Sequence, residues 1–190
     1  MNSHPGLHRH SKLWWVLLIA FLIFGVPRVY ETVSRIYRES TEETRKIATA
    51  RHQLEAIGRV LEAYKAEYGN YPRPVGGATD PVTVAKMLYQ AATGDGTDMI
   101  DNAVPIPSDG NPGTDGRAFA ELWFISAEEL ERLSHPGRYL IDPWGNPYRY
   151  IRGDDGPTTK NRTTFDLWST QKTKANGEPL WLANWPEAME

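Results

Sequence analysis

Residues Lys46 to Pro72 read KIATARHQLEAIGRVLEAYKAEYGNYP, and this segment carries the strongest structural signal in the chain. Apolar residues recur in it at steps of three and four, and mostly polar residues fill the positions between them, as in an amphipathic helix. Gly69 comes directly after the repeat and is followed by Tyr71-Pro72, which predicts the end of the helix. The repeat consists of Ile47, Ala50, Leu54, Ile57, Leu61, Tyr64 and Tyr68.

The apolar repeat continues toward the N-terminus and predicts one amphipathic helix over residues 28–72, about 60 Å long if it is unbroken. Ser40 and Glu43 match a capping box, so a helix that restarts there is an alternative. From Leu54 onward we expect the stripe to cover the domain's own sheet. The domain is too small to cover the rest, which leaves the upstream part available for packing against other copies. The predicted assembly stripe is Val33, Ile36, Tyr37, Ile47, Ala50 and Leu54.

An apolar run, LWWVLLIAFLIFGV from Leu13 to Val26, precedes this helix. As a helix it would reach about 21 Å, less than the roughly 30 Å of the hydrocarbon layer, but Lys12 and Arg28 can extend to the headgroups. A cleaved signal peptide is disfavoured because the best cleavage site, Ile23-Phe24-Gly25, lacks one of the small residues required. We therefore expect a polar tail over residues 1–12 and an uncleaved single-pass anchor over 13–27. The flanking charges alone leave its orientation open.

Residues 73–190 predict one further domain. Asp80 and Pro81 are a preferred N-cap and first-turn pair, which predicts a helix from there to about Ala92. Later segments are rich in aromatic and β-branched residues and alternate with turns, as in an antiparallel meander. The expected strands are 138–141, 147–152 and 163–170, and the apolar tail 180–185 is expected to pack on the sheet. The prediction is an α+β fold with the long helix across a small three-stranded antiparallel sheet.

Residues 94–116, GDGTDMIDNAVPIPSDGNPGTDG, form a predicted irregular loop because they are dense in Asp, Gly, Pro and Asn. Asp109, Asn111 and Asp115 within it are conceivable calcium ligands. Their spacing and the missing distal Glu do not match an EF-hand, so we favour a solvated loop without a metal.

Two stretches resemble the major pseudopilins of type II secretion systems, which are type IV pilin-like proteins. AYKAEYGNYP at 63–72 is similar to the end of that family's long helix. LIDPWGNPYRY at 140–150, followed by FDLWST at 165–170, is similar to the strand, turn and strand of its C-terminal domain. The resemblance covers about residues 47–170 and implies a pilin-like fold. Its signature residues are Tyr64, Gly69, Tyr71, Pro72, Asp142, Pro143, Trp144, Gly145, Asn146, Pro147 and Tyr148.

The resemblance implies a structural role in protein export. The N-terminal helix would lie in the inner membrane and the head outside the cytoplasm, in the periplasm. Partners would be membrane lipid, copies of the chain and other pseudopilins, stacked through their helices. Family members begin with a basic leader and carry Glu at the fifth position of the hydrophobic run, but residues 13–26 contain no Glu, so N-terminal processing stays open. The family's calcium loop would fall on QKTKANGE at 171–178, which lacks the needed carboxylates, so we expect no cofactor.

The sequence contains no catalytic motif, and we expect no enzyme and no small-molecule substrate. His52 and His135 have no partner suggested by a motif, and Asp154 with Asp155 is more typical of a turn than of a catalytic pair. A net charge of -3 gives no electrostatic case for nucleic acid, and the absence of cysteine excludes thiolate chemistry. The alternative function is a membrane-tethered module that does not polymerise and binds glycan or peptide through surface aromatics.

Overall fold

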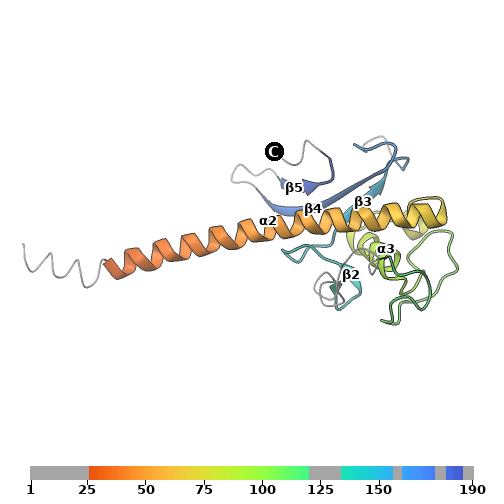
Figure 1. The fold of residues 1–190 in the computed structure, drawn as a ribbon, viewed down its shortest axis with the longest axis horizontal. Coiled ribbons are helices and arrows are strands. Elements are labelled where there is room, and N and C mark those ends of the chain that lie inside the picture. The colour runs from red at the N-terminus through yellow and green to blue at the C-terminus, as the bar shows by residue number, and fades with distance from the viewer. Residues whose placement is uncertain (1–25, 120–133, 156–159, 174–178, 186–190) are drawn as a thin grey trace, which may run out of the picture. The chain divides into compact units, whose positions relative to one another are not determined.

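The computed structural model describes residues 26–119, 134–155, 160–173 and 179–185, as drawn in colour in Figure 1. The chain divides into two compact units, Met1–Arg45 and Lys46–Glu190. The predicted tail over 1–12 and almost all of the predicted anchor over 13–27 lie outside the described residues. Within the described ranges, no helix combines the length and the hydropathy that crossing a membrane requires.

The long helix α2 extends over Val26–Tyr68 without interruption. Its course through Ser40 excludes the predicted alternative of a restart there. The Thr44 hydroxyl donates to the Ser40 carbonyl oxygen at 2.9 Å, four residues earlier in the same helix. The helix ends four residues before Pro72, because Gly69 adopts a left-handed conformation with φ of 82°. The Gly69 amide donates to the Lys65 carbonyl oxygen at 2.8 Å, which satisfies one carbonyl of the last turn.

The predicted α+β architecture with a three-stranded antiparallel sheet is confirmed, but one strand was assigned wrongly. The sheet has the order β3-β4-β5, with β3 at Arg149–Arg152, β4 at Phe165–Thr173 and β5 at Pro179–Ala183. The expected strand at 138–141 is instead β2, Tyr139–Leu140, which pairs with β1, Ser134–His135, in a separate two-stranded sheet. A single bridge between Ile141 and Pro147 links this region to the residues before β3, and Pro147 has no amide hydrogen to extend it.

The C-terminal part of α2 and one face of β3 share the hydrophobic core. Tyr148 and Tyr150 are two residues apart, so their side chains point to the same side of the extended chain, and both are almost fully buried. The Tyr148 hydroxyl donates to Oε1 of the buried Gln53 at 2.6 Å, and the Tyr150 hydroxyl donates to the Pro72 carbonyl oxygen at 2.9 Å. These two bonds fasten the sheet to the helix and to the residues that follow it.

A second helix completes the core. α3 covers Pro81–Thr93, and the Asp80 carboxylate accepts a hydrogen bond from the Thr83 amide at 2.9 Å, which confirms the predicted N-cap. Nearly every residue of α3 after its first turn is buried. The helix contacts β2 and β3, and its apolar residues share one core cluster with those of α2. A short 3-10 turn, η2 at Val75–Gly77, connects the end of α2 to this helix. Residues 94–116 contain no helix and no strand apart from one isolated bridge at Ile100, as predicted.

Two glycines of the long helix are expected to respond oppositely to alanine. A Cβ atom on Gly58 would lie 3.8 Å from Cζ of Phe165, an ordinary contact, so Gly58→Ala should stabilise the protein by about 0.5–1 kcal/mol through helix propensity. A Cβ on Gly69 would meet nothing, yet the positive φ should make Gly69→Ala destabilising by about 1 kcal/mol. Denaturant unfolding of the full-length chain measures both. The same sign for both variants would contradict this account of the helix end.

The link between Tyr148 and Gln53 is expected to make a measurable contribution to stability. Tyr148→Phe leaves the buried amide oxygen of Gln53 without its donor and should lower the free energy of unfolding by about 1–3 kcal/mol. Adding Gln53→Leu removes the orphaned acceptor and should restore much of that loss. Chemical denaturation of wild type, both single variants and the double variant provides the test. A fully stable Tyr148→Phe protein, or a double variant no better than the single one, would refute this role.

Candidate functional site

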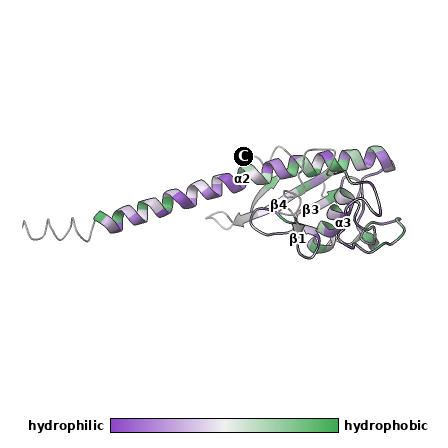
Figure 2. Cartoon of the chain, turned by 60° about the horizontal axis from the view of Figure 1, so that its bottom comes forward, coloured by the Kyte–Doolittle hydropathy of each residue, from purple (hydrophilic) through white to green (hydrophobic). Residues whose placement is uncertain are grey.

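The apolar stripe on α2 is exposed in one unit and buried in the other. Val29, Tyr30, Val33, Ile36 and Tyr37 have between 57% and 75% of their surface exposed. In the unit that begins at Lys46, the same stripe enters the core. Figure 2 shows the apolar residues of the upstream part recurring among hydrophilic ones. The five upstream side chains therefore present a continuous apolar stripe without a partner in the described part of the chain.

The six predicted assembly residues likewise fall into an exposed group and a buried group. Val33, Ile36 and Tyr37 are exposed, whereas Ala50 and Leu54 are buried in the core and Ile47 packs partly against it. Ala50 and Leu54 already have intramolecular partners, so only the upstream three offer apolar surface to another molecule. Sequence periodicity found the stripe but could not mark this boundary, because the repeat itself does not change there.

The predicted signature around Asp142 forms a tight structural turn. The Asp142 carboxylate is 3% exposed and accepts hydrogen bonds from the amides of Trp144 at 3.0 Å and Asn146 at 2.8 Å. Its other oxygen accepts from the Ser169 hydroxyl at 2.5 Å, which joins the turn to β4. Gly145 supplies the positive φ of 86° that the turn requires. These bonds give the DPWGNPY segment a role in folding.

The other signature residues lie where α2 meets the domain. Gly69 ends the helix, and Tyr71 is buried with its hydroxyl donating to the Glu62 carboxylate at 2.7 Å. Tyr64 packs beside the core, and the carbonyl oxygen of Pro72 receives the Tyr150 hydroxyl. The structure thus brings the two separated stretches of the signature together through the core.

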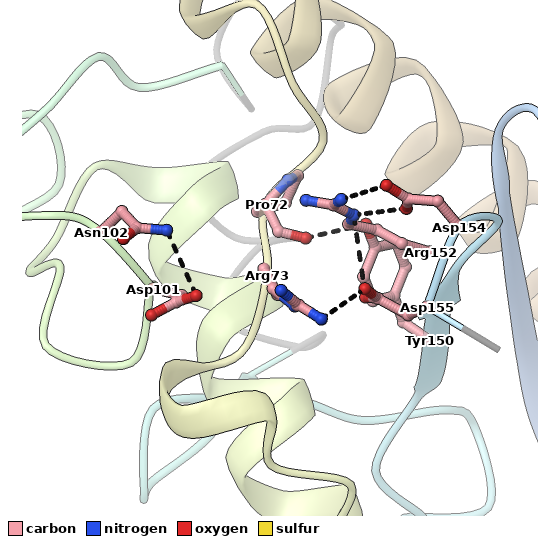
Figure 3. Close-up of polar contacts among 8 residues, drawn as sticks. All are labelled: Pro72, Arg73, Asp101, Asn102, Tyr150, Arg152, Asp154 and Asp155. Atoms are coloured by element: carbon pink, nitrogen blue, oxygen red, sulfur yellow. Dashed lines mark hydrogen bonds and ion pairs between the residues drawn. The ribbon is translucent and has the colours of Figure 1, made fainter.

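Two arginines and two aspartates form a cluster beside Pro72, drawn in Figure 3. Arg73 pairs with Asp155 at 2.8 Å, and Nε of Arg152 donates to Asp154 at 2.8 Å and lies 3.7 Å from Asp155. The hydrogen bond from Arg152 lowers the pKa of the Asp154 carboxyl, whereas a general acid near neutral pH needs a raised pKa. This arginine–aspartate cluster (Arg73, Arg152, Asp154, Asp155) neutralises its own charges and secures the turn after β3 to the chain after α2.

A groove of about 690 Å³ lies between the end of α2 and the segment 94–119. Tyr68 is half exposed at its wall, and two better-buried aromatic rings support it from behind. Tyr64 is 4.5 Å from Tyr68 between ring centroids, and Phe119 is 6.1 Å away in an edge-on arrangement. Exposed Val104 lines the groove as well. The size and mixed lining suit a small ligand or part of a chain.

The loop 94–116 is organised by Asp95, a residue that the sequence analysis did not single out. The Asp95 carboxylate is fully buried and accepts from the Tyr89 hydroxyl at 3.0 Å and the Ser108 hydroxyl at 2.7 Å. It also accepts from the amides of Asp109 at 2.8 Å and Gly110 at 3.0 Å. The sequence feature that could have identified Asp95 is its position between two glycines, directly after a predicted helix. The predicted irregular loop is therefore a packed one, held by a central carboxylate.

Carboxylates of Asp95, Asp109 and Asp115 approach one another within 4.8 Å, which is a spacing that a cation could bridge. Each of them also accepts hydrogen bonds from the loop itself, including the bond from the Gly96 amide to Asp115 at 3.0 Å. Arg138 adds positive charge by donating to the carbonyl oxygens of Ser108 and Asp109. The arrangement is accounted for by loop folding. At the place where the resemblance implies a calcium loop, residues 171–173 belong to β4 and 174–178 lie outside the described residues.

The hydrogen bonds around Asp95 determine its protonation. Burial opposes ionisation, but the bonds from Ser108, Gly110, Tyr89 and Asp109 outweigh it, so the pKa of Asp95 lies below its ordinary value. Burial and the bond to Asp95 raise the pKa of Tyr89 to about 12. Asp95 is therefore an ionised acceptor, and Tyr89 a neutral donor, throughout the neutral pH range.

Comparisons of the chain with protein-family models, with curated protein sequences and with solved structures find no match.

Replacing Asp95 is expected to loosen the loop in a pH-dependent way. Asp95→Asn should cost about 2–3 kcal/mol at pH 7, because a buried charged acceptor is lost. A carboxyl whose pKa is lowered in the folded state stabilises the protein above its unfolded pKa of about 3.9, and this contribution disappears as the pH falls through the folded value. The difference between wild type and variant should therefore shrink below about pH 4.

Denaturant unfolding at pH 7, 5 and 3 measures this difference. Asp109→Asn is the matched control, since that exposed side chain accepts only from Asn111 among the bonds described and should change stability little. A difference between wild type and Asp95→Asn that is equally large at pH 3 would contradict the assigned role of the ionised carboxylate.

Proposed function

We propose that this protein is a pilin-like structural subunit that acts by helix packing with other copies, in an export assembly of the type II secretion kind. The observation that carries the proposal is the exposed stripe of α2, on which five large apolar side chains between Val29 and Tyr37 are each more than half exposed. Burying such a side chain is worth about 1.5–3 kcal/mol, so a matching helix face would be a strong partner.

The apolar run from Leu13 to Val26 supports a membrane location. It precedes the exposed stripe directly, so subunits anchored by it would share one orientation and could pack their helices side by side. The head would lie on the outer side of the inner membrane, and the partners would be lipid, copies of the chain and related subunits. This role requires packing surfaces and no catalytic group or cofactor.

A second candidate function is a tethered binding module that remains a monomer. The groove favours this binding function, because the half-exposed ring of Tyr68 packs against Tyr64 and Phe119 and is therefore restrained where a ligand could contact it. The expected use of exposed tryptophans has less support, since Trp144 and Trp168 are partly buried and Trp185 is buried. The two functions differ in one requirement: an assembly subunit needs the stripe of α2, whereas a monomeric binding module does not.

Charged substitutions on the stripe test the proposal. Val33→Glu and Ile36→Glu should each reduce self-association of the full-length protein in bilayers by at least tenfold, because a carboxylate would have to be buried at the packed face. Arg35→Glu is the control: Arg35 is exposed on the opposite side of the same helix turn, so this variant changes the charge by more and should still retain most association.

Association can be followed by cross-linking through an engineered cysteine, since the chain has no native cysteine. Thermal unfolding of each variant verifies that the head remains folded. If Val33→Glu and Ile36→Glu associate as the wild type does, the helix does not pack through this face and the assembly function is wrong.

A further inference from the structure

Another cavity, of about 480 Å³, lies between the residues after α2 and the outer face of β3. Its lining includes Pro74 and Ala78 from the chain between α2 and α3, Val84 from α3, and Arg149, Ile151 and Trp168 from β3 and β4. None of these residues belongs to the predicted assembly stripe, and all lie in the unit Lys46–Glu190. The cavity therefore calls for an explanation separate from helix packing.

The lining of this cavity is positively charged. Arg73, Arg149 and Arg152 contribute to it, against the single acidic lining residue Asp155. Arg73 and Arg152 are neutralised by the aspartates of the arginine–aspartate cluster. Arg149 forms no ion pair in the described ranges. One positive charge is thus left over at the wall of the cavity.

The environment of Arg149 makes this charge costly. Its Nε atom is buried and has no hydrogen-bond partner among the residues that the structure describes. Taking a guanidinium partly out of water without an acceptor or a counter-charge destabilises a folded protein, and natural proteins rarely leave such a group uncompensated. A bound anion at this wall would remove that cost.

The remaining lining defines the chemistry of that anion. Val84 is almost fully buried at the wall, and Trp168 lies directly across the ladder from Arg149, so the charge adjoins apolar surface. A single uncompensated positive charge matches a monoanion better than a doubly charged phosphate. Guanidinium groups pair well with the planar carboxylate.

We propose that this cavity, the Arg149 pocket (Arg73, Pro74, Ala78, Val84, Arg149, Ile151, Trp168), binds a carboxylate attached to an apolar body. Arg149 supplies the charge, and the apolar walls take up the body of the ligand. The ligand can be a free organic acid or the C-terminal carboxylate of a polypeptide, which have the recognised chemistry in common. This inference does not rest on the proposed assembly function.

Calorimetric titration of the full-length protein tests the ligand class with three probes. 3-Phenylpropionate carries both features and should bind. 3-Phenylpropanamide has the same body without the charge, and inorganic phosphate has charge without a body, so each should bind at least tenfold more weakly. Equal binding of the amide would show that charge is not recognised, and tighter binding of phosphate would show a general oxyanion site; either result overturns the proposal.

Arg149→Met tests the residue, because it removes the guanidinium and keeps an unbranched apolar stem. It should weaken 3-phenylpropionate at least tenfold while the melting temperature of the ligand-free protein stays equal or rises, because an uncompensated cation has been removed. Arg162→Met is the matched control at an exposed position outside the pocket and should change neither value. Unchanged binding by Arg149→Met overturns the proposal.

A second variant keeps the test decisive if Arg149→Met does not fold. Ala78→Leu narrows the cavity without altering any charge and should also weaken 3-phenylpropionate, so undiminished binding by this variant again overturns the proposal. The source of the ligand is separated by the peptide Gly-Gly-Phe with a free C-terminus. Tighter binding than 3-phenylpropionate assigns the pocket to a polypeptide end, and weaker binding assigns it to a free acid; both outcomes support carboxylate recognition.

Discussion

Two tyrosine hydroxyls, on one face of the chain at and just before β3, hold together the unit Lys46–Glu190, here called the head. Tyr148 donates to Gln53 within α2 and Tyr150 donates to Pro72 just beyond it, so the sheet is fixed at one point to the helix and at another to the chain that follows it. Both rings are buried, and a misplaced sheet would leave polar groups unpaired inside the core. Arg73 follows Pro72 directly and Arg149 and Arg152 flank Tyr150, so the arginine–aspartate cluster and the Arg149 pocket adjoin this attachment.

The two parts of α2, before and after about residue 46, differ in how their apolar side chains are used. Between Ala50 and Leu61 the apolar stripe is buried in the core, and this part of the helix supports the head. Between Val29 and Tyr37 the same periodicity produces side chains that are mostly exposed. A protein that used α2 only for its own fold would gain nothing from an apolar stripe there, which is why the proposed function places a neighbouring helix against it.

Local patterns in the sequence predicted the local features of the fold. The three-to-four spacing predicted the helix, Gly69 its end, and Asp80 with Pro81 the start of α3. The third strand was missed because 138–141 and 179–183 are both apolar, and only long-range pairing decides which of them joins β4. Asp95 was missed for the same reason, because its role depends on Ser108, which is distant in sequence. The surroundings of Arg149 likewise include Ala78 and Trp168, which no local pattern connects with it. The repeat in α2 likewise could not reveal where burial begins, since that boundary is set by the extent of the head.

The head covers only the C-terminal part of one continuous helix, and amide hydrogen exchange of the monomeric full-length protein can measure this difference along α2. Amides of residues 50–61 should exchange only through global unfolding, with the same free energy as amides of β4, because the apolar side chains of this part of α2 are buried in the core. Amides of residues 30–45 should exchange through local opening at a distinctly lower free energy. Uniform protection along the whole of α2 in the monomer would contradict the account.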